Sequence, residues 1–434
     1  MAYVSLEERG RLTLRKRYNG AILNRIASGI MALLGLLVLA FFVRKALASP
    51  GVFIQQILNG IQLGFLYALI ALGYTMVYGI IRLINFAHGD VFMVGAMTSF
   101  FAISTMELHR WPFNIWPGIN NLLGTLLGSA TVIILSMVMC SLLAVTIERF
   151  AYRPLRAMPR IAALITAIGV SFFLEYFGAL PFVYTNNYIT YPRPFELTVL
   201  RAKDIPPWAL GLLSGVFVLS LGTYLTVNGL SNKGNSRAAL WRNHPVLQFF
   251  LYLGGLLTLV LGLVVVLPTL GIIKWDLTVS NVMLVIMSAS ILLVVALQYI
   301  VTRTKVGKAM RASAYDKPTS RLMGINVDNI IAVTFAIGGA LAGAGGVLYA
   351  TAFKQVHHLM GILPGLKAFI AAVLGGIGSI PGALVGSLIM GMAEVLSAGF
   401  ISTPMRDAVA FSLLIIILLI RPQGIFGEAP GEKV

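Results

Sequence analysis

The sequence predicts an all-α membrane protein, a polytopic transmembrane helical bundle with broken helices. Hydrophobic residues make up 58% of its 434 residues and charged residues only 11%, whereas soluble domains carry about 25% charged residues. Apolar runs recur along the chain and predict about 11 membrane segments, since about 20 apolar residues cross a bilayer as a helix. These runs are continuous, which excludes a β-barrel, whose strands alternate apolar and polar residues.

The distribution of basic residues predicts the orientation of the bundle. If the N-terminus is cytoplasmic, the segments expected inside contain 22 of the 32 Lys and Arg residues. Loops rich in these residues face the cytoplasm, so both termini are expected there. The net charge of +17 therefore reflects topology and lipid headgroups rather than a nucleic-acid partner. The expected spans are 27–43, 52–80, 86–105, 119–147, 161–184, 207–229, 247–269, 281–301, 328–352, a broken pair across 364–400, and 405–420.

The chain divides into four expected parts. Arg44 and Lys45 follow the first span and no clean small-residue cleavage site stands out, so this helix is expected to stay uncleaved. Two later spans surround a basic loop, and an inserted helix hairpin of this kind leaves the topology on both sides unchanged. The parts are a basic cytoplasmic N-terminus with an extra first helix (1–50), the N-terminal half of the core (51–200), the inserted hairpin (201–280) and the C-terminal half of the core (281–434).

Glycines spaced four residues apart recur inside the apolar runs. The spacing places both glycines on one helix face and lets two backbones approach closely, which predicts a tightly packed bundle. The pairs are Gly60 and Gly64, Gly124 and Gly128, Gly339 and Gly343, and Gly382 and Gly386.

Two stretches predict breaks in the helices. LINFAHGD, residues 83–90, places polar residues between two apolar runs with almost no loop. Its Asn85 and Asp90 favour turn and cap geometry, and we expect Asp90 to cap the next helix. Residues 366–396 would form a helix of roughly 46 Å, too long for a hydrocarbon core of about 30 Å. GGIGSIPG in its middle therefore predicts a break.

Two interpretations of these breaks remain open. Non-helical backbone at membrane depth is tolerated where it is buried in protein or lines an aqueous cavity, and broken helices form the substrate path in transporters. In the other interpretation, both stretches are short cytoplasmic turns between ordinary helices. The candidate residues for the translocation path are Asn85, His88, Gly89, Gly375, Gly376, Gly378 and Pro381.

Few ionisable residues interrupt the apolar runs. Glu175 and Glu394 lie within such runs, where charges usually face the protein interior and mark a pathway or a pair. Lys367 begins a run and either faces inward or extends its ammonium group toward the membrane surface. Cys140 is the single cysteine, which excludes intrachain disulfides and Cys-rich zinc sites. No metal-ligand cluster, phosphate loop or catalytic motif is present, so we expect no enzyme, no metal and no cofactor bound by this chain.

Several motifs together carry a family resemblance. NGIQLGFLYALIALGYTMVYGIIRLINFAHGD, ERFAYRPLR, RIAALITAIGVSFFL and GKAMRASA occur in this order. RLMGINVDNIIAVTFAIGGALAGAGGVL, GLKAFIAAVLGGIGSIPGALVGSLIMGMAEVL and RPQGIFG follow. The chain resembles the LivH-type permeases of branched-chain amino-acid ABC importers over residues 52–200 and 281–427.

This resemblance implies a permease subunit of the bacterial inner membrane. The expected partners are a second, LivM-like permease, two cytoplasmic ATPase subunits that bind ATP, and a periplasmic or lipid-anchored binding protein. Permeases of related importers for urea, amides or other amino acids are the alternative, and a stand-alone secondary transporter is a weaker one. Gradient-driven uptake by this chain alone would identify a secondary transporter.

The polar segment 302–326 is the expected ATPase-coupling loop. Its GKAMRASAYD favours a short amphiphilic helix after Gly307, which Pro318 limits. A solvated basic loop is the simpler interpretation, but it leaves the alanine-rich run unexplained. The segment resembles the family's ATPase-facing loop, although Tyr315 stands where that loop usually has glutamate. The resemblance implies that four residues dock onto an ATPase: Arg311, Ala314, Asp316 and Gly324.

Overall fold

The computed structural model describes residues 37, 40–83, 85–156, 158–201 and 278–427. Most of the expected first helix at 27–43 and both expected spans of the inserted hairpin lie outside these residues. The chain forms two compact units, Met1–Ile54 and Gln55–Val434. In the first unit, residues 40–48 are helical and the Lys45 Nζ lies 5.6 Å from the centre of the Phe41 ring.

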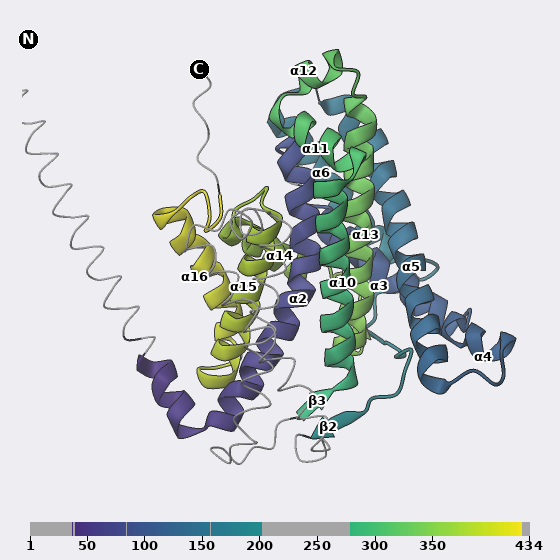
Figure 1. Cartoon of the computed structure of the whole chain (residues 1–434), viewed down its shortest axis with the longest axis vertical. Helices are drawn as coiled ribbons and strands as arrows, with labels where there is room; N and C mark the ends of the chain where they lie inside the picture. Colours follow the sequence, from purple (N-terminus) through teal and green to yellow (C-terminus); the bar gives the residue numbers. More distant parts are fainter. Residues whose placement is uncertain (1–36, 38–39, 84, 157, 202–277, 428–434) are drawn as a thin grey trace, which may run out of the picture. The chain divides into compact units, whose positions relative to one another are not determined.

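Helices make up most of the described chain, which confirms the predicted all-α class (Figure 1). The long helices are α2 (Pro50–Ile81), α3 (His88–Ser104), α5 (Asn121–Ile147), α6 (Arg160–Gly178), α10 (Asn281–Arg303), α13 (Val327–Phe353), α14 (Ile362–Gly375), α15 (Ile380–Phe400) and α16 (Met405–Ile420). The short ones are η1 (Leu108–Arg110), α4 (Trp111–Ile115), the π-helix η2 (Glu148–Tyr152), η3 (Arg153–Leu155), α11 (Lys305–Tyr315) and α12 (Lys317–Leu322).

Six helices in the described part are long and apolar enough to cross a membrane. A seventh span results if the pair His88–Ser104 and Leu108–Ile115, bent by 64°, counts as one. The six are Pro50–Ile81, Asn121–Leu155, Ile161–Gly178, Asn281–Arg303, Val327–Phe353 and Ile380–Phe400.

Glycine contacts bring the helices of the core together, as their spacing predicted. A Cβ added to Gly343 on α13 would lie 2.6 Å from the carbonyl oxygen of Ser136 on α5. Gly60 and Gly64 on α2 would come within 2.8 Å of the α15 backbone in the same way. At such separations even a methyl group is excluded, so the packing of these helices depends on the missing side chain.

Two short antiparallel sheets connect the loops. In one, β2 (Val199–Arg201) pairs with β3 (Thr278–Ser280), with Arg201 opposite Thr278. This pairing holds the two ends of segment 202–277 side by side, which is the arrangement that an inserted hairpin requires. In the other, β1 (Ile189–Thr190) pairs with β4 (Gln355–Val356).

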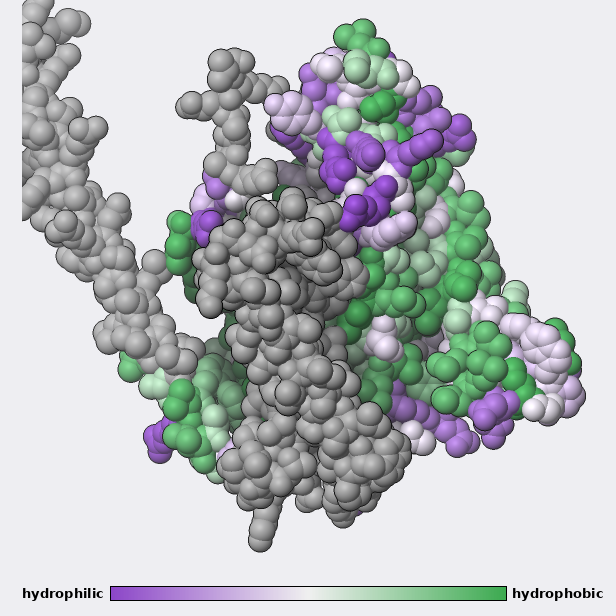
Figure 2. Space-filling view, viewed as in Figure 1, coloured by the Kyte–Doolittle hydropathy of each residue, from purple (hydrophilic) through white to green (hydrophobic). Residues whose placement is uncertain are grey.

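The two ends of the bundle differ in character. Helices α11 and α12 lie at one end, called here the α12 end, and β2 and β3 lie at the other, called here the β3 end (Figure 1). Hydrophilic side chains gather around α11 and α12, whereas apolar side chains cover the flank of the bundle below them (Figure 2). This surface is the one expected of a bundle whose flank faces lipid and whose ends face water.

Replacing Gly346 should disturb the central packing of α3 against α13. An added Cβ there would lie 2.7 Å from the backbone nitrogen of Ala96, while nothing lies within 4 Å of the equivalent position at Gly169 on α6. Overpacked substitutions cost typically about 1–3 kcal/mol. We therefore expect Gly346→Val to lower the thermal unfolding midpoint of the purified protein well below that of Gly169→Val, the matched control. Equal midpoints for the two variants would contradict the packing described.

Candidate functional site

After the first predicted break, α3 begins beside α2, part-way along that helix, rather than at its end. Arg82 closes α2 in a left-handed conformation, with φ of 59°. The chain then runs back along α2, and the ring of His88 packs 4.7 Å from that of Tyr74. A Cβ added to Gly73 would strike the His88 ring. Since Gly73 lies eight residues before Ile81, α3 begins roughly 12 Å from the end of α2.

The backbone that precedes α3 is buried and hydrogen-bonded. Asn85 is 4% exposed, and its Oδ1 accepts a hydrogen bond of 2.6 Å from the Tyr152 hydroxyl on η2. The backbone N–H of His88 donates to the Asn85 carbonyl oxygen at 3.1 Å. Burial in protein is one of the two settings in which irregular backbone is tolerated at membrane depth.

The expectation that Asp90 caps α3 is wrong. The helix begins at His88 with Ala87 as its N-cap, so Asp90 lies inside the first turn. Its buried carboxylate instead accepts a hydrogen bond from the Ser171 hydroxyl on α6, which also lies 3.5 Å from Glu175. The partner on α6 is distant in sequence, and the backbone N–H groups of His88, Asp90 and Val91 already donate to the carbonyls of Asn85 and Ala87. A side-chain cap is therefore not required.

The N-terminal turns of α3 and α14 meet in the interior. A Cβ added to Gly89 would lie 2.6 Å from the Gly361 carbonyl oxygen and 3.3 Å from the Gly365 Cα. Helix N-termini carry partial positive charge, and half-helices that meet near the membrane midplane form substrate sites in several transporter folds. Here glycine contacts close the junction tightly.

The second predicted break is a turn between antiparallel helices. The left-handed φ angles of Gly376 (105°) and Gly378 (103°) reverse the chain, a conformation that glycine adopts without steric cost. Ser379 then caps α15 through the N–H of Gly382, and Pro381 lies in the first turn of α15. The C-terminal segment covers this turn, because the N–H groups of Ile425 and Phe426 donate to the carbonyls of Leu374 and Gly375.

The final turns of α2 lie between the two breaks. Tyr74 contacts His88 on one side and Phe369 of α14 on the other, with ring centroids 5.8 Å apart for the second pair. A Cβ added to Gly79 would lie 3.7 Å from the Gly378 Cα. The structure thus brings the two predicted breaks against one helix, while contact between Asn85 and the turn itself is not among the described interactions.

A buried network of charges joins α14, α15 and α16. The Lys367 ammonium lies 2.8 Å from Glu394 and 2.6 Å from Asp407. Arg406 Nε lies 2.5 Å from the same Glu394 oxygen, and the Tyr67 hydroxyl on α2 donates to the other oxygen at 2.8 Å. The Lys367 side chain is 6% exposed and that of Glu394 is 1% exposed. Lys367 therefore faces inward, and the alternative that it extends to the membrane surface is wrong.

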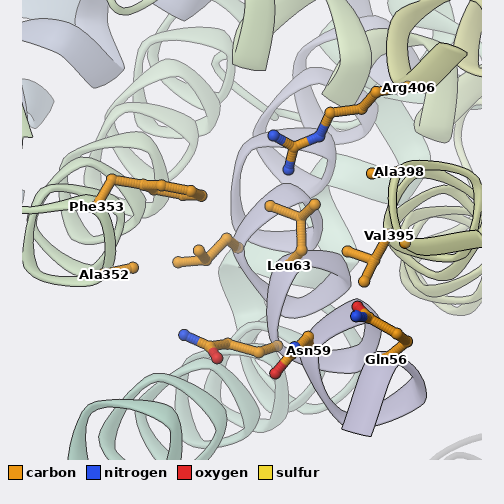
Figure 3. A pocket seen from close by; sticks show the side chains of 11 residues that line it. Gln56, Asn59, Leu63, Ala352, Phe353, Val395, Ala398 and Arg406 are labelled. Atoms are coloured by element: carbon orange, nitrogen blue, oxygen red, sulfur yellow. The ribbon is translucent and has the colours of Figure 1, made fainter. Parts of the chain in front are cut away.

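A cavity of about 400 Å³ adjoins this network toward the β3 end of α2 (Figure 3). The guanidinium group of Arg406 points into it, toward Leu63 and Phe353. Amide and leucine side chains of α2 line one wall, and residues of α13, α15 and α16 line the rest. The lining residues are Gln56, Asn59, Gln62, Leu63, Leu66, Ala352, Phe353, Val395, Ala398, Gly399 and Arg406.

The expected coupling loop folds into two short helices. Helix α11 buries Gly307, Met310 and Ser313 on one face, in agreement with the predicted amphiphilic helix. Asp316 caps α12, where its carboxylate accepts from the N–H of Thr319. Gly324 follows α12 with φ of 81°, and the N–H groups of residues 324 and 325 close the helix end in a Schellman pattern.

Large apolar side chains are exposed on the surface of the α12 end. Tyr315 is 90% exposed, Leu322 87% and Met323 79%, while Arg311 is exposed and Ala314 half-buried. Soluble surfaces seldom cluster side chains of this size in the open, and such patches mark interaction sites. This surface is named the tip patch below.

Ion pairs hold the tip patch to the rest of the bundle. Asp328, at the start of α13, lies 2.5 Å from Arg156 Nη1 and 3.3 Å from Arg153 Nη2. Arg156 also pairs with the buried Glu148, and Arg321 of α12 lies 3.7 Å from Asp328. The ERFAYRPLR motif thus supplies the basic partners that fix α12 and α13 relative to α5.

Lys317 shows how densely positive charge is gathered at the α12 end. Burial, together with the positive charges of Arg156, Arg82 and Arg321, lowers the pKa of its ammonium group below the ordinary value of lysine. A surface of this kind is complementary to anionic lipid headgroups or to acidic protein groups.

Comparison with known proteins identifies the family. Residues 56–418 match the family described as the permease component of branched-chain amino acid transport systems. The chain belongs to this permease family. The members are transport subunits, which agrees with the prediction that the chain is not an enzyme. No solved structure showed a significant match.

The relatives of this family member include bacterial and archaeal permeases. It is 36% identical over 382 residues to the high-affinity branched-chain amino acid transport system permease protein LivH of Escherichia coli K12, covering 88% of this chain and 98% of the relative. It is 35% identical over the same shares to the corresponding permease BraD of Pseudomonas aeruginosa. A probable LivH of Methanocaldococcus jannaschii is 32% identical over 145 residues, 32% of this chain and 45% of the relative.

Sequence reasoning missed several residues of the cavity and the network. Arg406 and Asp407 lie at the start of an expected span, where charged residues are common and indicate no particular role. Gln56, Asn59 and Gln62 escaped notice, although polar residues three apart on an apolar helix share one face and could have revealed it. The network also needs helices that are far apart in sequence, which no spacing rule brings together.

Removing Lys367 should destabilise this permease more than removing Tyr67. Lys367→Met removes the ammonium group from both Glu394, which then keeps only Arg406, and the half-exposed Asp407. Breaking a fully buried ion pair costs about 3–5 kcal/mol, and this partly compensated change is expected to cost somewhat less. Tyr67→Phe removes one hydrogen bond to a carboxylate, a loss of about 1.5–3 kcal/mol. We expect the thermal unfolding midpoint of the purified protein to fall further for Lys367→Met. A midpoint equal to that of the unsubstituted protein would show that the network is not formed.

Proposed function

We propose that this chain is a membrane permease subunit of an ABC importer that moves branched-chain amino acids across a bacterial inner membrane. The observation that carries the proposal is the 36% identity to a branched-chain amino-acid permease across 98% of that protein. The cavity and buried charge network lie within the residues that match the family.

The energy source is expected in separate subunits. The proposed partners are a second, LivM-like permease, two cytoplasmic ATPase subunits that bind ATP, and a periplasmic or lipid-anchored binding protein. ATP-driven closure of the ATPase pair would shift the permease between outward-facing and inward-facing states. A nucleotide or solute can do so only through unequal affinity for the two states.

The two helix breaks are proposed to line the translocation path. In support, the junction of α3 with α14 and the Gly375–Gly382 turn both contact the last turns of α2. Glycine contacts close the junction in this conformation, and transport would require it to open. The interpretation of both breaks as plain turns predicts instead that they are insensitive to changes that preserve packing.

Other substrates are less well supported. Permeases named for autoinducer 2 import match over only 105 residues, 23% of this chain, at 26% and 30% identity. Branched-chain amino acids are the proposed substrate, ahead of urea, amides or other amino acids, because relatives named for branched-chain amino-acid transport match over 98% of their length.

Reconstitution tests this proposal. The chain is co-expressed with its candidate partner subunits, and the complex is placed in vesicles with binding protein outside and ATP inside. We expect leucine, isoleucine or valine uptake that requires ATP and all subunits. Gradient-driven uptake by the chain alone, or ATP-driven uptake of urea in place of the amino acids, would contradict the proposal.

The tip patch should dock an ATPase subunit. Leu322→Asp and Met323→Asp place charge on exposed apolar positions without touching the core. We expect both to lower binding-protein-stimulated ATP hydrolysis and uptake together by about tenfold or more, as interface anchors do. Met106→Asp, at a 67% exposed position just after α3, is the control. Ala314→Trp tests the expected docking face, whereas Gly324 substitutions would also strain the backbone. Unchanged stimulation in the two Asp variants would refute docking here.

Asn85 should matter beyond its hydrogen bond if it lines the path. Asn85→Ala and Tyr152→Phe each remove the bond between the Tyr152 hydroxyl and Asn85 Oδ1. We expect uptake by the assembled complex to fall much further for Asn85→Ala, since only this variant removes the amide itself. Equal losses would assign Asn85 a structural role, and intact uptake in both would favour the turn interpretation.

A further inference from the structure

We propose that the cavity beside Arg406 is a binding site for one zwitterionic amino acid with an aliphatic side chain. This inference rests on the proposed function and assigns it a location within this chain. Protein ligand sites enclose about 300–1,000 Å³ and combine mostly apolar walls with a few placed polar groups. A cavity of about 400 Å³ with one cation, three amides and an apolar remainder has this composition.

Arg406 supplies the group that recognises a carboxylate. Its Nε lies against Glu394, while its guanidinium group extends into the cavity (Figure 3). Within the described residues, its Nη atoms form no ion pair. The side chain is 33% exposed, so a ligand in the cavity can reach the Nη groups. Guanidinium groups bind carboxylates through two parallel hydrogen bonds, which fixes the orientation of the ligand.

The α2 wall supplies oxygen atoms for an ammonium group. Gln56, Asn59 and Gln62 recur every three residues along the cavity and are half-buried. Asn59 Oδ1 already accepts a hydrogen bond from Gln55 at 3.2 Å, which leaves the carbonyl oxygens of the two glutamines as the acceptors. Amide oxygens bind an ammonium group without adding charge to the site.

The remaining walls suit a branched aliphatic side chain. Leu63, Leu66 and Val395 line the cavity beside the aromatic ring of Phe353. Burial of aliphatic carbon against such walls contributes to affinity without a requirement for hydrogen bonds. A polar side chain would leave its own donors and acceptors unpaired there, which is costly.

Charge balance selects against acidic and basic amino acids. The network contains two cations, Lys367 and Arg406, and two carboxylates, Glu394 and Asp407, joined by three ion pairs of 2.5–2.8 Å. A zwitterion leaves this group neutral, whereas a ligand with net charge would leave one charge uncompensated beside an apolar bundle. Uncompensated charge in such a place is strongly unfavourable.

The test measures amino-acid binding to the assembled importer in lipid nanodiscs, with the binding protein left out. Labelled leucine is the probe, and leucinamide (no carboxylate) and 4-methylpentanoate (no ammonium) are the competitors. We expect leucine to compete best and both analogues to compete poorly, because each lacks one end of the zwitterion. This comparison uses the unsubstituted protein and does not depend on whether a variant folds.

Two variants test the location. Arg406→Gln should weaken leucine binding by about tenfold to a hundredfold, as expected for loss of a charge-assisted pair. Arg406→Lys should retain part of the affinity, since it keeps the positive charge but loses the two parallel N–H donors of the guanidinium group. Ala398→Trp should block binding by filling the cavity while Arg406 is unchanged. Arg110→Gln, an exposed arginine on η1 paired with Glu107 at 3.7 Å, is the matched control and should bind as the unsubstituted protein does.

The outcomes separate this inference from the proposed function. If the importer takes up leucine but binds it equally well in the Arg406→Gln and Ala398→Trp variants, the site is wrong and the function stands. Leucinamide competing as well as leucine, or no leucine binding by an active importer, also overturns the site. A complex that takes up no branched-chain amino acid fails at the proposed function instead.

Discussion

Buried charge must be neutralised locally, and this constraint organises the C-terminal half of the permease. Lys367 lies within hydrogen-bond distance of Glu394 and Asp407, and Arg406 and Tyr67 complete the set. The five side chains come from four helices, so none of these helices can shift without breaking a charged contact. An isolated charge here would cost several kcal/mol. The network therefore fixes the wall of the cavity as well as the packing of α14 against α15 and α16.

At the helix breaks, the helices are held together by glycine contacts rather than by charges. Charges hold the cavity side rigid, while the α3–α14 junction consists of backbones in contact, with Gly89 against Gly361 and Gly365. Small-residue contacts of this kind have few interlocking side chains to unpack, so two arrangements of the helices can lie close in free energy. Under the proposed function, we infer that the charge network forms a fixed recognition wall and that the junction separates during alternating access.

The sequence predicted the parts of the fold that local physics controls. Apolar runs placed the described spans to within a few residues, and GGIGSIPG marked the turn after Gly375 because positive φ and a missing amide donor are local properties. Contacts between helices that are distant in sequence could not be predicted from it. Whether Asp90 caps a helix or binds Ser171 depends on α6, and Lys367 turns inward only because α15 and α16 bring carboxylates to it. Arg406 carried no local signal of its role.

A density map of the assembled importer with bound leucine tests the central claim most directly. The complex would be held in nanodiscs in its outward-facing state, with leucine in excess and the binding protein absent. We predict density for one amino acid in the cavity, with its carboxylate within hydrogen-bond distance of Arg406 and its side chain against Leu63 and Val395. Leucine bound elsewhere in the complex, with the cavity filled by side chains of the partner permease, would contradict the account.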